Sequence, residues 1–197
     1  MGKRTEKISG THQRIIDAAV TLHGSIGPAR TTIAGVAEKA GVTRLTVYRH
    51  FPDDNALFSA CSSHWLSQQQ LPDPGEWSRH KDPFERLTVG LTDLYRFYRD
   101  GESMLTRIYG DWNALPEAHR TGLESRNAHF RDILAEPFPK PNRNLRLDAT
   151  LSHAISFWTW RSLCHDNRLS NDDAVDVMSI LITTAATGGG QRLPAGA

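Results

Sequence analysis

Apolar residues recur at helical spacing along most of this 197-residue chain, and no segment alternates between apolar and polar residues as a half-buried strand does. The pattern predicts an all-α protein. Helices are expected over residues 11–24, twice within 31–51, and over about 54–69, 83–98, 104–112, 116–136, 145–165 and 172–187.

Glycine, proline and charged stretches divide these helices into two predicted domains. Residues 70–83 form a loop with three prolines and a glycine, and the proline-rich run 137–144 cannot be helical. The polar residues 1–10 are expected to be a mobile arm, and the tail from about residue 188 is expected to be disordered. We place a DNA-binding domain in residues 1–58 and a ligand-binding and dimerisation domain in residues 59–197.

Two short helices joined by a tight turn are predicted in residues 31–51, TTIAGVAEKAGVTRLTVYRHF. Ile33 and Val36 lie on one apolar stripe of the first helix. Gly41 follows where the chain must turn sharply, because glycine takes a positive φ without steric cost. Thr43 is a good N-cap for the second helix, since its hydroxyl can accept a free backbone N–H.

The second of these helices leaves a polar set facing outward, because Val47 and Phe51 point inward. Arginine can bind guanine or phosphate, and threonine can bind phosphate or touch a thymine methyl. Tyrosine and histidine suit the sugar–phosphate edge. The arrangement predicts a helix-turn-helix whose second helix enters the major groove, with an ordinary helix hairpin as the alternative. The outward residues are Arg44, Thr46, Tyr48, Arg49 and His50.

The stretch from about Gln13 to Leu57 resembles the tetracycline-repressor (TetR) family of bacterial transcription regulators. The matching residues are Thr31-Thr32, Val36-Ala37, Ala40-Gly41-Val42-Thr43 and Thr46-Val47-Tyr48-Arg49-His50-Phe51-Pro52. The resemblance implies a three-helix N-terminal DNA-binding unit, a larger helical-bundle ligand-binding domain, and a homodimer on a palindromic operator. The residues assigned to DNA binding are Thr32, Thr43, Arg44, Leu45, Thr46, Tyr48, Arg49 and His50.

Two positions depart from the family pattern. Leu45 stands where the family often has a small residue, so a bulkier apolar group faces the groove. Asp54 stands where the family often has a lysine close to a phosphate. Because an aspartate would repel that phosphate, we assign no DNA contact to Asp54.

The charge of the chain is unevenly distributed. The net charge is +1, but residues 1–51 hold eight Lys and Arg against three Asp and Glu, so this part carries +5 and the remainder −4. A basic end on an acidic body fits a DNA-binding head on a sensing domain. The absence of an apolar run of about 18 residues and of a signal peptide predicts a cytoplasmic protein without a membrane partner, and the resemblance implies a bacterial one. Two cysteines, Cys61 and Cys164, fit reduced thiols.

The last two helices carry wide apolar stripes that predict a dimer. A helix that covers only its own core needs an apolar stripe of about 100°. The extra surface is best buried against a second copy as a four-helix interface, although deep burial within one subunit is the alternative. The predicted interface residues are Leu147, Leu151, Ala154, Trp158, Ala174, Met178, Leu181 and Ala185.

The aromatic residues of the body predict a pocket for a small apolar or amphipathic effector, since pockets between bundle helices are mostly apolar. Ordinary core packing is the alternative for each residue. The residues assigned to the pocket are Tyr109, Trp112, Phe130, Phe157 and Arg161.

Catalytic chemistry finds little support in the residues. Cys164, His165 and Asp166 are consecutive, so on a helix they are expected to point in different directions. No phosphate-binding loop, metal-ligand spacing or nucleophile elbow occurs, and we expect no catalytic residue, metal or cofactor. The sequence therefore predicts a ligand-responsive repressor. A ligand-independent architectural DNA-binding protein or an enzyme is the alternative.

Overall fold

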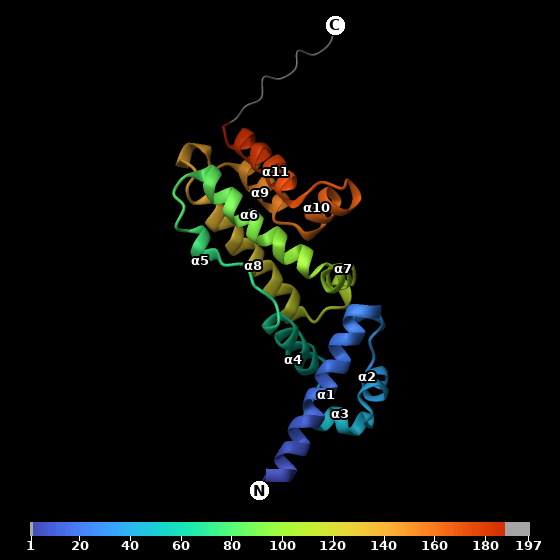
Figure 1. The fold of residues 1–197 in the computed structure, drawn as a ribbon. Coiled ribbons are helices and arrows are strands. Elements are labelled where there is room, and N and C mark those ends of the chain that lie inside the picture. Colours follow the sequence, from blue (N-terminus) through green and yellow to red (C-terminus); the bar gives the residue numbers. More distant parts are fainter. Residues whose placement is uncertain (1, 188–197) are drawn as a thin grey trace. The chain divides into compact units, whose positions relative to one another are not determined.

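The computed structural model describes residues 2–187, which contain helices and no strand, so the predicted all-α fold is confirmed (Figure 1). The helices are α1 (Gly2–Ile26), α2 (Ile33–Ala40), α3 (Arg44–His50), α4 (Asp54–Ser67), α5 (Pro74–Trp77), α6 (Pro83–Asp100), α7 (Glu102–Gly110), α8 (Glu117–Ala135), α9 (Leu145–Ala154), α10 (Phe157–Arg161) and α11 (Asn171–Ala186). No helix in this part of the chain is long and apolar enough to span a bilayer.

The chain folds into two compact units. The described residues up to Leu71 form the head unit together with Asp100–Gly122, and the body unit consists of Pro72–Arg99 and the described residues from Leu123 onward. The domain boundary expected at residue 58 falls inside α4. Because the chain returns to the head unit after α6, a single cut in the sequence does not separate the two units.

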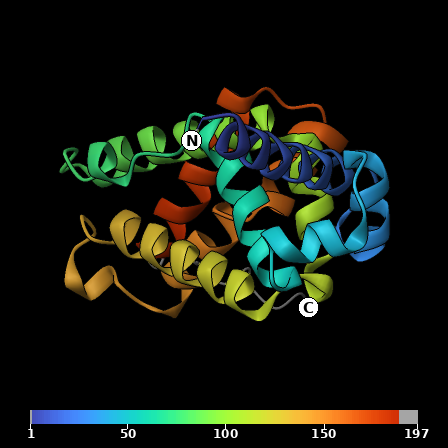
Figure 2. The same cartoon turned by 90° about the horizontal axis from the view of Figure 1, so that it is seen from below.

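The head unit has its core where α2 and α3 lie beside α1 (Figures 1 and 2). Small and branched residues recur at helical spacing on α1 and form one apolar face. The other two helices pack closely against this face. α4 closes the remaining side through Leu57 and Cys61. The fully or nearly fully buried residues of the first three helices include Ile15, Ile16, Ala18, Ala19, Val36, Ala37 and Val47.

The first helix is longer than the sequence pattern predicted, because it runs from Gly2 to Ile26 instead of from residue 11 or 12 to Gly24. Residues 2–10, which were expected to belong to a mobile arm, are therefore helical. The charged residues of that stretch are good helix formers, and its polarity alone does not oppose a helix. Met1 and the expected tail from residue 188 lie outside the described residues.

A tight turn follows α1 and is fixed by a residue just after α7. Gly27 has φ +86° and ψ 162°, a conformation that is essentially restricted to glycine. The Ala29 N–H donates a hydrogen bond of 3.0 Å to Asp111 Oδ2. A Cβ atom on Gly27 would lie 2.2 Å from the same oxygen. This contact sets the point at which the chain turns toward α2.

The body unit is organised around buried polar side chains that bind backbone carbonyls. Arg86 is 1% exposed and donates to the carbonyl oxygens of His80 and Ile133 and to the Glu136 carboxylate. Arginine is seldom buried without such partners. The network therefore satisfies the charge of Arg86 and ties the start of α6 to the end of α8.

One helix expected over residues 145–165 is broken in the structure. α9 ends at Ala154, and α10 begins at Phe157. The hydroxyl groups of Tyr95 and Tyr98 donate to the carbonyl oxygens of Ala154 and Ile155, at 2.9 and 2.7 Å. These hydroxyl groups satisfy carbonyls that a continuous helix would bond internally, so the break is stabilised from α6.

Candidate nucleic-acid interface

The short helices α2 and α3 begin at threonine caps and are joined by a glycine turn. The Thr32 hydroxyl accepts the Gly35 N–H at 3.1 Å, and the Thr43 hydroxyl accepts the Thr46 N–H at 3.2 Å. Gly41 has φ +67° and ψ 40°, the left-handed conformation expected at this position. These local contacts start α3 at Arg44 and thereby fix which of its side chains face outward.

The exposed face of α3 carries most of the residues assigned to DNA binding. Val47 is fully buried, whereas Leu45 and Tyr48 are 61% and 48% exposed. Outside α3, the capping residue Thr32 is also exposed. The predicted outward placement is seen, with Thr46 and His50 half-buried, and DNA contact by this set stays a prediction. The remaining exposed members are Thr43, Arg44 and Arg49.

His50 at the end of α3 packs against a histidine that sequence reasoning missed. The ring centroids of His12 and His50 are 5.7 Å apart, and the His12 ring also lies 4.7 Å from that of buried Phe51. Partial burial and the nearby His12 lower the pKa of His50. The half-buried His50 ring can still offer a hydrogen bond to DNA. Because His12 is distant in the sequence, no local motif links it to α3.

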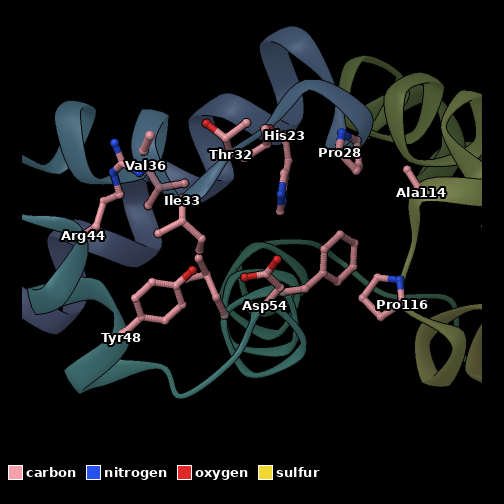
Figure 3. Close-up of a pocket in the computed structure, with 14 residues that line it drawn as sticks. His23, Pro28, Thr32, Ile33, Val36, Arg44, Tyr48, Asp54, Ala114 and Pro116 are labelled. Atoms are coloured by element: carbon pink, nitrogen blue, oxygen red, sulfur yellow. The ribbon is translucent and has the colours of Figure 1, made fainter.

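A cleft of about 440 Å³ opens in the head unit beside this face (Figure 3). Its walls come from the end of α1, from α2, α3 and α4, and from the segment around Ala114 and Pro116. Three residues assigned to DNA binding line the cleft, namely Thr32, Arg44 and Tyr48. The cleft therefore adjoins the side chains that would meet a nucleic acid.

The inner wall of the cleft is uncharged at neutral pH. Burial, with a smaller contribution from His119, lowers the pKa of His23 to about 4. The His23 Nδ1 lies 3.3 Å from the Cys61 Sγ, and burial raises the pKa of that thiol to about 12. A neutral imidazole beside a protonated thiol is a packed pair, not an activated nucleophile.

Residues 15–61, which span the end of α1 and all of α2 and α3, match the family model described as "Bacterial regulatory proteins, tetR family". This segment is therefore a helix-turn-helix domain of the tetR type.

Two curated proteins that are similar to this chain are named as regulators of transcription. The chain is 30% identical over 118 residues to the "Probable acrEF/envCD operon repressor" of Escherichia coli (strain K12), across 55% of this chain and 52% of that protein. It is 44% identical over 61 residues to the "HTH-type transcriptional regulator TtgR" of Pseudomonas putida, across 30% of this chain and 29% of that one. The chain thus spans about half the length of the first relative and less of the second.

The likeness to solved structures extends over most of the chain. A TetR-like transcriptional regulator from Rhodococcus sp. RHA1 superposes with a TM-score of 0.64 at 19% identity, and the match covers 90% of this chain and 96% of that one. At this identity the match concerns the fold. The helical body that follows the helix-turn-helix domain is therefore TetR-like in architecture.

The five residues assigned to an effector pocket are divided between the two units, and a shared pocket stays a prediction. Tyr109 and Trp112 stack on each other in the head unit, with ring centroids 6.4 Å apart. In the body unit, Phe130 packs against Trp77 at 4.9 Å. The other two have separate contacts, since Phe157 lies 5.5 Å from Tyr98 and Arg161 pairs with Asp166 at 3.3 Å. Each aromatic member thus packs against an aromatic neighbour of its own unit.

The residues assigned to the dimer interface fall into two groups, and five of the eight are corrected. Leu147, Leu151, Ala154, Ala174 and Met178 are at most 2% exposed within a single chain, so they have no surface to offer a second copy.

The other three residues of that assignment keep solvent contact. Trp158 and Leu181 are 45% and 51% exposed, and Ala185 is half-buried. Val177 and Ile180, which the assignment omitted, are 38% and 59% exposed. Helical spacing indicated that the stripe on α11 is wide but could not say which side of it faces the chain's own core.

The run Cys164-His165-Asp166 lies in a π-helical turn and not in a regular α-helix. The expectation that its consecutive side chains point in different directions therefore holds only in part. The His165 Nδ1 and Asp166 Oδ1 atoms are 3.0 Å apart, so these two side chains do meet. The Cys164 Sγ instead approaches Asn171 Oδ1 at 3.4 Å, and burial raises the pKa of the thiol. Within residues 2–187, no group of three or more His, Cys, Asp or Glu side chains is placed to hold a metal ion.

Proposed function

We propose that this protein is a DNA-binding transcription regulator that inserts α3 into the major groove. The observation that carries the proposal is the capped α3, whose buried Val47 holds Arg44 and Tyr48 outward. An α-helix with its side chains is about 10–12 Å across. A major groove about 12 Å wide admits such a helix.

The outward residues have distinct proposed roles. Arg44 and Thr46 suit base edges or phosphates, and the exposed Leu45 suits a thymine methyl group. Tyr48 and Arg49 suit the sugar–phosphate edge, where they would fix the register of the helix. Thr32 stands at the start of α2, where free backbone N–H groups favour a phosphate.

The proposed active form is a homodimer. Val177, Ile180 and Leu181 share one side of α11 through their i, i+3 and i+4 spacing, and all three are exposed. We call these three residues the α11 face. Large apolar side chains gathered on one exposed helix face favour burial against a partner, and a second copy related by two-fold symmetry supplies the same face. Two α3 helices would then read half-sites of a palindrome about 34 Å apart.

The proposed output is repression that a small molecule relieves. The E. coli relative is named as an operon repressor, which supports this direction of regulation. We propose that the protein acts in the cytoplasm by binding DNA and a small molecule. Neither catalysis nor a cofactor is part of the proposed role. A ligand that favours a body conformation with altered head spacing would weaken operator affinity by about 5–150-fold, the usual range of allosteric coupling.

Selection of bound duplexes from a random DNA pool tests the proposal. The expected product is a palindrome with two half-sites, and affinity for it should fall steeply as salt rises because phosphate contacts release counterions. An architectural protein would enrich flexible DNA without a defined half-site. Failure to enrich any duplex at low salt would contradict the proposed function.

A further inference from the structure

The cleft in Figure 3 has the volume of a small-molecule site. Its volume of about 440 Å³ falls within the range of about 300–1,000 Å³ that is usual for ligand pockets. His23 and Phe58, which are 8% and 6% exposed, form its inner part. The exposed Arg44 and Tyr48 stand at its mouth. All of the lining residues belong to the head unit, so the cleft exists independently of the body unit.

A carboxylate occupies the middle of this cleft. Figure 3 shows the Asp54 side chain directed into the space between Tyr48 and the inner wall, whereas the Arg44 guanidinium points away from it. No side chain in the described part of the chain forms a hydrogen bond or ion pair with the Asp54 carboxylate. The neighbouring Asp53, by contrast, caps α4 by accepting the Ala56 N–H at 2.8 Å. The carboxylate of Asp54 is therefore available to a ligand.

Apart from Arg44, whose guanidinium points away from Asp54, the remaining wall offers aromatic faces and no Lys or Arg side chain. His23 is neutral at physiological pH because burial lowers its pKa to about 4. The ring of Phe58 packs between His23 and His119, with centroid distances of 5.0 and 4.5 Å. A carboxylate beside Phe58 and Tyr48 is the combination that favours a cation with an apolar body, because ring faces attract positive charge.

We propose that this cleft binds a small organic cation whose charged nitrogen lies at Asp54 and whose aromatic or alkyl body lies against Phe58 and Tyr48. The ligand would occupy the head unit itself. Because the body of the cation would lie against Tyr48, the bound cation would compete directly with DNA for this side chain. The competition depends on the proposed function, whereas binding of the cation does not.

Titration of the full chain with benzyltrimethylammonium tests the site, with benzenesulfonate as the anionic probe of similar size. NMR of the isotope-labelled chain would report binding through amide shifts at Ile33 and Phe58. The test variant is Asp54→Asn, and the control is Glu38→Gln, which neutralises an exposed carboxylate of the head unit outside the cleft lining.

The cation should bind the parent and the Glu38→Gln control equally, and bind Asp54→Asn about fivefold more weakly, the effect of losing one solvent-accessible ion pair. Equal binding to Asp54→Asn, or no binding at millimolar cation, would overturn the site. Shifts in the cleft caused by benzenesulfonate and not by the cation would also overturn it, because they would identify an anion site.

Competition is measured with the operator selected from random DNA. At a cation concentration ten times its dissociation constant, simple competition raises the apparent operator Kd of the parent about 11-fold and that of Asp54→Asn about threefold. An unchanged operator Kd with the cation bound would overturn the competition. If the chain binds the cation with the expected Asp54 dependence but binds no DNA at all, the proposed function fails and the cation site stands.

Discussion

The turn between α1 and α2 depends on Gly27, so a Gly27→Ala substitution should destabilise the head unit through two separate effects. The φ of +86° with ψ of 162° is a region that costs a non-glycine residue about 1–3 kcal/mol. The new Cβ would also lie 2.2 Å from Asp111 Oδ2. The carboxylate must then move and release the Ala29 N–H, which adds about 1–2 kcal/mol.

We expect Gly27→Ala to lower the free energy of unfolding by about 2–5 kcal/mol in the parent, the sum of the strain and the displaced hydrogen bond. In an Asp111→Ala background the steric conflict is absent, so the same substitution should cost only the backbone strain of about 1–3 kcal/mol. Urea unfolding of the four proteins of this cycle gives both values. A cost below about 1 kcal/mol in the parent, or equal costs in the two backgrounds, would refute this account of the turn.

Three further predictions concern pH, assembly and charge. The pKa of His23 falls from 6.5 to about 4 on folding, so the unfolded chain binds more protons than the folded chain between these pH values. The free energy of unfolding, measured in urea, should therefore drop by about 2 kcal/mol from pH 7 to pH 5. The same drop in a His23→Gln variant would contradict this. The double variant Ile180→Asp, Leu181→Asp should be a folded monomer where the parent is a dimer, because charge on the α11 face opposes burial of that face against a second copy. Light scattering measures the mass, and an unchanged mass would exclude the α11 face as the interface. Asp54→Lys should tighten operator binding and steepen its salt dependence by about 0.9 in slope for one added phosphate contact, whereas an unchanged slope would place the DNA backbone elsewhere.

The helix-turn-helix could be predicted from the sequence because its determinants are local. Gly41 requires a left-handed conformation, and Thr43 caps the helix that begins one residue later, so both positions carry their structural meaning within a few residues. The burial of Val47 and the exposure of Leu45 and Tyr48 follow from the same register. The outward set could therefore be named before the structure was known.

The body features that could not be predicted depend on contacts between distant residues. The hydroxyl groups of Tyr95 and Tyr98 stabilise the break after Ala154, and they lie more than fifty residues away in the sequence. Likewise, the apolar stripe of α11 contains both Met178, which faces the core, and Ile180, which faces solvent. Periodicity identifies such stripes, but only the packing of the neighbouring helices decides which side is covered.

Local sequence patterns do not predict the cleft either. Its lining combines His23 of α1, Asp54 of α4 and Pro116, which follows α7, and no short motif contains these residues. The sequence did mark Asp54 as unusual through the charge that it places near the expected phosphate. Its position among aromatic side chains became evident only from the fold.

The operator affinity of Arg44→Ala and Tyr48→Ala tests the central claim most directly. Both side chains are exposed, so the variants should fold and assemble as the parent does, with Arg146→Ala, an exposed arginine of α9, as the matched control. Each α3 variant should lose at least about 1 kcal/mol of binding free energy on the selected operator, while the control binds as the parent does. Parent-like affinity in both α3 variants would contradict the assignment of α3 as the recognition helix.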